Sequence, residues 1–178
     1  MNNKTVCFSG HRPEKLPGKG DDKREETIYI KKILTEKIRL CISDGYTEFI
    51  SGVARGIDLW AAQTVLRMKA VYPSVILRCV KPVSDQGINF PDNDKLLLDF
   101  ILSNADDVIC TCQSYTRNCY MIRNRYMVDH SDKLIAFVKN YRSGTGQTIN
   151  YAMKLNKNVD ITDLSDINNL MSFEQLTF

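Results

Sequence analysis

One short segment, Ser51-Gly-Val-Ala-Arg-Gly-Ile-Asp58, places two glycines and an arginine between an apolar strand and an amphipathic helix. Gly52 and Gly56 can take positive φ angles or let a ligand approach the backbone, and the free N–H groups of a starting helix favour an anion. The same glycines can also do no more than close a tight turn. The segment therefore predicts an α/β unit whose turn either receives a phosphate or ribose or is purely structural. Its spacing is neither the dinucleotide fingerprint nor a P-loop.

Strands and helices alternate along the rest of the chain. Short, nearly continuous apolar runs are typical of strands in a parallel sheet that is covered on both faces, and apolar residues at helical spacing lie between them. Right-handed crossovers then predict a doubly wound, mainly parallel α/β sheet with helices on both faces. The expected strands are 5–8, 48–50, 75–80, 107–110, 133–138 and 158–161. A loop is expected from 13 to about 22, followed by a helix that carries its apolar residues between 30 and 42 on one face and stops near 44–45. The other expected helices are 57–69, 94–104, 117–130 and one that opens at 142–148.

The length and charge of the chain fit a single soluble domain. We expect one ligand-binding domain over residues 1–162 and a C-terminal helical tail over 163–178. A net charge of +3, with the basic residues spread along the chain, argues against a dedicated nucleic-acid-binding tail. There is no signal-peptide pattern and no apolar run near the roughly 20 residues of a membrane helix, so we expect a cytoplasmic protein without membrane contact.

The six cysteines are typical of reduced thiols rather than of a metal site. Cys7, Cys79 and Cys110 fall in expected strands and Cys41 on the apolar side of a helix, so we expect these four to be buried. Cys-x-x-Cys pairs are absent, and the only histidines are His11 and His130. The sequence therefore predicts no bound metal.

Polar loops follow four expected strands at their carboxyl ends: 9–12, 51–58, 81–93 and 143–148. Ligands of doubly wound sheets bind at that edge. The last loop, SGTGQT, offers hydroxyl and N–H donors to a phosphate, or it is a turn in which Thr145 or Thr148 caps the helix. The residues that we expect to contact a ligand are Ser9, Gly10, His11, Arg12, Ser51, Gly52, Arg55, Gly56, Asp58, Arg123, Asn124, Gly144, Thr145, Gly146, Gln147 and Thr148.

Two of these residues keep alternative roles. Arg123 falls beside the apolar face of the helix 117–130, where a cation needs an anionic partner. That partner is either internal, Asp58 or Asp129, or a ligand phosphate. His11 is either a general acid or base, since its ordinary pKa lies near neutrality, or a hydrogen-bonding residue that orients the turn.

Several motifs resemble known proteins. SGVARGID, FPD at 90–92, RNR at 123–125, SD at 131–132 and SGTGQTINYA at 143–152 occur in the order found in the DNA-processing proteins DprA. The opening FSGHRPEKLPG resembles the YpsA-like branch of the SLOG superfamily, which unites DprA with the LOG phosphoribohydrolases. The resemblance covers all but the C-terminal end of the chain. It implies a Rossmann-like fold that binds nucleotides or nucleotide-derived ligands at these loops.

The chain departs from the LOG enzymes at one important position. Those enzymes carry a Pro-Gly-Gly-x-Gly-Thr-x-x-Glu motif whose glutamate helps to hydrolyse an N-glycosidic bond. Here the corresponding position holds Asn150, Tyr151 or Ala152, and no carboxylate lies between 143 and 157. The remaining catalytic candidates are His11, Glu14 and Asp58.

The leading hypothesis is a sensor or regulatory module that binds a nucleotide-derived ligand, with no other cofactor expected. In it, Gly52, Gly56, Gly144 and Gly146 let the ligand approach, and Arg12, Arg55 and Arg123 neutralise phosphate. One alternative is an enzyme that cleaves a nucleotide N-glycosidic bond. Another is DprA-like binding of single-stranded DNA, which the modest charge and the few aromatic residues near the loops disfavour. Homo-oligomerisation stays open.

Overall fold

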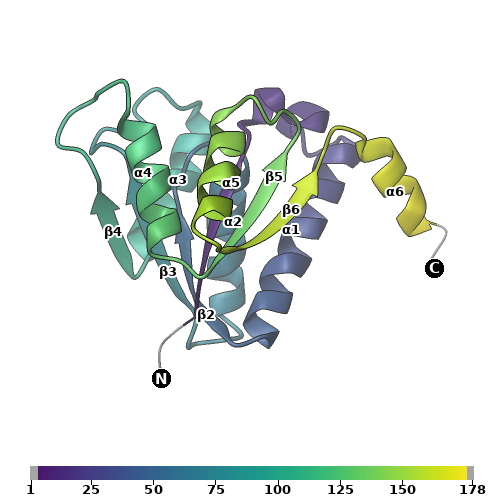
Figure 1. Cartoon of the computed structure of the whole chain (residues 1–178), viewed down its shortest axis with the longest axis horizontal. Helices are drawn as coiled ribbons and strands as arrows, with labels where there is room; N and C mark the ends of the chain where they lie inside the picture. Colours follow the sequence, from purple (N-terminus) through teal and green to yellow (C-terminus); the bar gives the residue numbers. More distant parts are fainter. Residues whose placement is uncertain (1–3, 176–178) are drawn as a thin grey trace.

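Six parallel strands form one sheet within residues 4–175, the part of the chain that the computed structural model describes. The strand order is β4-β3-β2-β1-β5-β6 (Figure 1). This order confirms the doubly wound, Rossmann-like prediction, with every described strand parallel. The strands are β1 (Lys4–Gly10), β2 (Tyr46–Ser51), β3 (Ile76–Lys81), β4 (Asp107–Cys110), β5 (Lys133–Val138) and β6 (Asn158–Asp163).

Helices cover both faces of this sheet, and each expected helix is present. The first of them begins at Glu25, after the expected loop, and its two glutamates suit the first turn of a helix. Two short 3-10 helices, η1 (Pro13–Lys15) and η2 (Pro17–Gly20), lie in the segment expected to be a loop. The α-helices are α1 (Glu25–Ser43), α2 (Ile57–Lys69), α3 (Asp92–Asn104), α4 (Cys119–Asp129), α5 (Gly144–Lys154) and α6 (Ile167–Gln175).

The alternation of side chains along the strands divides the core into two clusters. Val6 and Phe8 of β1 face the helices α1, α2 and α3, where Phe8 stacks on Phe49 with ring centroids 6.2 Å apart. Cys7, between them in the chain, faces the other way, toward the residues of α4 and α5. Figure 1 shows these two sets of helices on opposite sides of the sheet. Successive strand residues point to opposite faces, so both faces must be apolar.

The direction of strand addition changes between β1 and β5. From β1 the chain adds β2, β3 and β4 on one side, and it then returns to place β5 and β6 on the other. The loops that follow β1 and β5 therefore separate toward opposite faces of the sheet. A crevice opens between such loops, which is where doubly wound proteins bind ligands.

Two sequence expectations need correction or completion. Cys110 is exposed, because β4 is an edge strand with one face poorly covered, whereas Cys7, Cys41 and Cys79 are buried as expected. The C-terminal segment docks on the main domain: Leu164 is fully buried in the first cluster. The division at 162/163 stays a prediction, and residues 176–178 of that tail, like residues 1–3 of the domain, lie outside the described residues.

We predict that Gly146→Ala destabilises the protein whereas Gly144→Ala does not. A Cβ on Gly146 would overlap the backbone carbonyl of Tyr141, but a Cβ on Gly144 would have no heavy atom within 4 Å. Overpacking of this kind costs about 1–3 kcal/mol, or roughly 5 °C in melting temperature for a chain of this size. Thermal unfolding of the two variants measures the difference, and equal melting temperatures would contradict the packing of the β5–α5 turn.

Candidate ligand-binding site

A cleft of ≈ 430 Å³ opens at the carboxyl ends of β1 and β5, where the strand order changes direction. We call it the switch-point cleft. The segment after β1, the start of α4 and the start of α5 supply most of its walls. The residues that line it are Ser9, Gly10, His11, Arg12, Glu14, Lys15, Ala54, Asp58, Tyr120, Arg123, Asn124, Ser143, Gly144 and Thr145.

Arg123 and Asp58 form a buried ion pair within this cleft. Arg123 comes from α4 and Asp58 from the first turn of α2, and Nη1 lies 3.2 Å from Oδ2. Burial raises the pKa of the Asp58 carboxyl, against the opposing effects of Arg123 and of the Ala54 N–H. Burial also lowers the pKa of the Arg123 guanidinium. Asp58 is thus the internal partner of Arg123, while Asp129 accepts a hydrogen bond from the Tyr151 hydroxyl.

The guanidinium of Arg123 is not fully satisfied by this pair. Its Nε atom is buried and has no hydrogen-bond partner among the described residues. A buried donor that has lost its water and found no acceptor raises the free energy of the folded state. Arg123 lines the cleft and therefore has one hydrogen-bond donor there, Nε, that no acceptor among the described residues uses.

The turn after β2 is shaped around this arginine. A Cβ on Gly52 would overlap Nη1 of Arg123, so glycine at this position leaves room for the guanidinium. Val53 follows with a φ of 45°, which is unusual for a β-branched residue. The side-chain amide of Gln86 holds this backbone by donating to the carbonyls of Gly52 at 3.1 Å and Val53 at 3.0 Å.

Ser51 and Gly56 complete the same turn. The Ser51 hydroxyl donates to the Asp58 carbonyl at 2.7 Å and accepts the N–H of Val53 at 3.1 Å. Gly56 has a φ of 86°, and a Cβ there would stand 2.5 Å from the carbonyl oxygen of His11. A purely structural role in closing the turn therefore explains both Ser51 and Gly56.

His11 ties the loop after β1 to the loop after β5. Its Nε2 atom accepts the backbone N–H groups of Lys139 at 2.9 Å and Asn140 at 3.2 Å, so this nitrogen carries no proton. Burial, together with the nearby Lys15 and Lys139, lowers the pKa of His11 below its ordinary 6.5. The lone pair of Nε2 is occupied in an orienting contact, which favours the orienting role over that of a general base.

The start of α5 presents backbone to the cleft. Ser143 is the N-cap, and its hydroxyl accepts the N–H of Gly146 at 3.2 Å, so the alternative in which Thr145 or Thr148 caps this helix is wrong. Gly144 borders open space. The first N–H groups of a helix have no partner within it, so this end of α5 suits an anion.

Arg12 and Tyr120 form the outer part of the cleft. Cζ of Arg12 lies 5.7 Å from the centroid of the Tyr120 ring, and Cζ of Arg123 lies 5.9 Å from the same centroid. Arg12 has no ion-pair partner among residues 4–175. The ring of Tyr120 therefore stands beside two guanidinium groups, in a position to stack on a base or sugar.

Arg55 does not line the cleft, contrary to its expected place beside a phosphate. It forms ion pairs with Glu14 of η1 and with Asp94 of α3, the latter at 2.5 Å. These contacts join three segments around the start of α2. Because two carboxylates already neutralise it, Arg55 has little charge left to offer a ligand.

The structure brings together most, but not all, of the expected site residues. Asn124 donates to the Thr148 hydroxyl at 3.0 Å and connects the cleft to a second hollow between α4 and α5. The expected loop 81–93 contributes through Gln86, behind the turn rather than at the cleft. The expected residues absent from the cleft lining are Ser51, Gly52, Arg55, Gly56, Gly146, Gln147 and Thr148, of which Gln147 and Thr148 line the second hollow.

Sequence reasoning missed Lys15 and Tyr120, and within the expected loops it left out Ala54 and Ser143. Tyr120 precedes Arg123 by three residues on one helix, and residues at this spacing lie on neighbouring parts of a helix surface. This spacing was the signal in the sequence that could have identified Tyr120. The position of Tyr120 corrects the expectation that aromatic residues are sparse near the loops. For Lys15, the last residue of η1, no comparable signal was available.

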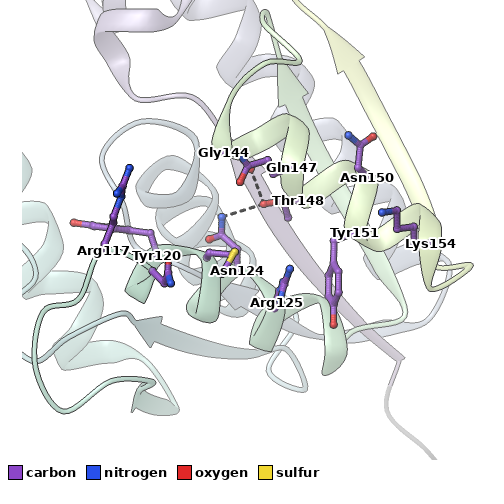
Figure 2. A pocket seen from close by; sticks show the side chains of 12 residues that line it. Arg117, Tyr120, Asn124, Arg125, Gly144, Gln147, Thr148, Asn150, Tyr151 and Lys154 are labelled. Atoms are coloured by element: carbon purple, nitrogen blue, oxygen red, sulfur yellow. Dashed lines mark hydrogen bonds between the residues drawn. The ribbon is translucent and has the colours of Figure 1, made fainter.

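The second hollow is a groove of ≈ 550 Å³ between α4 and α5, which we call the α4–α5 groove (Figure 2). It shares Tyr120, Asn124 and Gly144 with the switch-point cleft. In the described part of the chain there is no group of three His, Cys, Asp or Glu side chains placed to hold a metal ion. Within residues 4–175 there is also no helix long and apolar enough to cross a membrane.

A doubly wound parallel sheet with a polar cleft at its switch point defines a Rossmann-like α/β protein. Residues 6–170 match the model of the YpsA family, described as the YspA SLOG family. The chain therefore belongs to this SLOG family, as the resemblance of its opening motif implied.

Relatives and solved structures agree with this assignment. A UPF0398 protein of Bacillus cereus strain B4264 is 29% identical over 149 residues, covering 82% of this chain and 80% of the relative. A UPF0398 protein of Macrococcus caseolyticus is 24% identical over 176 residues, covering 95% of each chain.

Two DNA-processing proteins share the fold. DNA processing protein A from Helicobacter pylori, solved in work on its binding of single-stranded DNA, has a TM-score of 0.63 and 20% identity over 97% of this chain and 73% of its own. DprA from Streptococcus pneumoniae has a TM-score of 0.60 and 20% identity over 89% and 50%. At this identity the likeness establishes the fold alone.

We predict that the protein loses stability as the pH falls below about 6.5, because of His11. Its folded-state pKa is lowered, so the unfolded chain binds a proton first and acidification favours unfolding. The loss is at most about 1.4 kcal/mol per pH unit for one group. Denaturant unfolding of His11→Gln, which keeps an acceptor, should show a flatter profile between pH 5.5 and 7.5. His130→Gln is the control, and a flattening in that variant instead would contradict the assignment.

We also predict that Asp58→Asn is strongly destabilising and that added phosphate partly rescues it. The change leaves the Arg123 guanidinium buried without its counter-charge, at a cost of about 3–5 kcal/mol, or roughly 10 °C in melting temperature. An anion in the cleft can replace the lost carboxylate. The control is Asp99→Asn on the exposed side of α3. Equal stability of the two variants, or no extra response of Asp58→Asn to phosphate, would count against this account.

Proposed function

We propose that this protein binds a nucleotide or nucleotide-derived ligand in the switch-point cleft and acts as a sensor or regulatory module. The observation that carries the proposal is the buried Arg123, whose Nε atom lacks a partner at the point of the sheet where doubly wound proteins bind ligands. Membership of the SLOG family supports the same ligand class.

In this proposal each wall of the cleft has a separate task. The guanidinium groups of Arg12 and Arg123 and the free N–H groups at Gly144 and Thr145 bind a phosphate, since planar arginine and helix N-termini both suit phosphate oxygens. The ring of Tyr120 stacks on the base or sugar. The neutral His11 keeps the two loops at the right separation.

We further propose that binding occurs without hydrolysis of the N-glycosidic bond. Such hydrolysis usually needs placed carboxylates. Asp58 is paired with Arg123, Glu14 with Arg55, and Nε2 of His11 accepts two backbone N–H groups. Free base released from a panel of nucleotides, and lost in Asp58→Asn under conditions where thermal melts show that the variant is folded, would instead support the hydrolase alternative.

Single-stranded DNA binding is the second candidate. The observation that favours it is the position of Tyr120 beside two arginines, which is the combination of ring and charge that such proteins use. A steep fall of oligonucleotide affinity with salt would support this candidate over a small ligand.

We predict that Arg123→Lys weakens nucleotide binding about tenfold or more, whereas Arg78→Lys does not. Both arginines are paired with an acid, Asp58 and Glu48 respectively, and both variants keep the charge. Lysine cannot reproduce the planar fork that binds phosphate in two places, and a charged hydrogen bond is worth about 1.5–3 kcal/mol. Calorimetric titration with nucleoside monophosphates, after thermal melts confirm folding, measures the effect. Equal affinities would remove Arg123 from the proposed phosphate site.

A further inference from the structure

The α4–α5 groove continues the switch-point cleft along the outer face of the molecule. Figure 2 shows the two helices side by side, with α4 residues on one wall and α5 residues on the other. The Asn124–Thr148 hydrogen bond joins the two walls, and Thr148 also donates to the Gly144 carbonyl at 2.9 Å. Tyr120, Asn124 and Gly144 line both hollows, so a ligand in the cleft has the groove directly beside it.

The groove carries cations that form no ion pair with the described residues. Arg117, Arg125 and Lys154 line it, and none of them has an ion-pair partner among residues 4–175. No Asp or Glu is among its lining residues. Elsewhere on the surface, cations such as Lys69 and Arg39 are matched by carboxylates. An unneutralised basic hollow attracts an anion.

Aromatic rings lie at two places along this groove. Tyr120 stands where it meets the cleft, and Tyr151 lies farther along α5. The hydroxyl of Tyr151 donates to Asp129 at 2.8 Å, which holds the ring in place, and Cζ of Arg125 lies 5.1 Å from its centroid. A held ring with an adjacent guanidinium is suited to a second base or sugar.

The groove is also longer than a single phosphate needs. From Gly144 to Lys154 the helix α5 advances ten residues, or about 15 Å at 1.5 Å per residue. Its cations are spread over that length: Arg117 lies just before α4, Arg125 lies about two turns farther on, and Lys154 lies at the end of α5. This spacing suits two separated phosphates better than two adjacent ones.

We propose that the ligand is an elongated nucleotide with two phosphates separated by a nucleoside, as in a 5′-phosphorylated dinucleotide. The first phosphate lies in the switch-point cleft and the second in the α4–α5 groove near Arg125 and Lys154. This inference rests on the proposed function, because the first phosphate uses the site described there.

The test compares each ribonucleoside monophosphate with the matching 5′-phosphorylated dinucleotide by calorimetric titration. We expect the best dinucleotide to bind at least tenfold more tightly than its monophosphate. The double variant Arg125→Gln/Lys154→Gln should remove that gain and leave monophosphate affinity unchanged. The double variant Arg67→Gln/Lys95→Gln, which removes exposed and unpaired cations from α2 and α3, is the matched control.

The outcomes separate this inference from the proposed function. If a monophosphate binds as tightly as its dinucleotide, or if the groove variant changes nothing, the two-phosphate ligand is overturned while the cleft remains a nucleotide site. If neither ligand binds, the proposed function fails with it. A pyrophosphate-linked dinucleotide that binds more tightly than the phosphodiester form overturns the separation of the phosphates. If a 20-nucleotide single strand binds a hundredfold more tightly than the dinucleotide, the groove is a track for nucleic acid, and the proposal of a small ligand is overturned.

Discussion

The buried ion pair between Arg123 and Asp58 is the contact around which the carboxyl edge of the sheet is arranged. It joins α4, on one face, to the start of α2, on the other. Two charges taken out of water are tolerated only when they meet each other, so the backbone between them has to allow close approach. This requirement explains glycine at position 52, the unusual φ of Val53, and the amide of Gln86 that holds both carbonyls.

The pair also organises the charge of the cleft. Asp58 satisfies one nitrogen of Arg123 and leaves Nε without an acceptor, so the site is held together before a ligand arrives and still gains from an anion. His11 also holds the cleft in shape, because its Nε2 atom joins the loop after β1 to the loop after β5. Preorganisation of this kind lowers the entropy cost of binding. A rigid site of this kind would suit the sensor role proposed above.

Family membership and fold narrow the function without naming the ligand. The carboxylates at the cleft are each matched to an arginine, Asp58 to Arg123 and Glu14 to Arg55, which is an arrangement for structure and binding rather than for proton transfer. The unmatched charges are cations, and they continue from Arg12 in the cleft to Lys154 in the α4–α5 groove. This run of unmatched cations is the basis for the elongated anionic ligand proposed above.

The sequence alone determined the alternation of strands and helices, the turn at SGVARGID and the place of Arg123 beside a buried face, because periodicity, glycine placement and a cation beside an apolar face are local signals. It could not choose the partner of Arg123, since Asp58 lies 65 residues away and only the strand order brings the two together. The same holds for Arg55, which meets Glu14 and Asp94 instead of the cleft, and for Cys110, which is exposed because β4 lies at the edge. Side-chain partners across a sheet are set by which strands become neighbours, and that choice belongs to the tertiary structure.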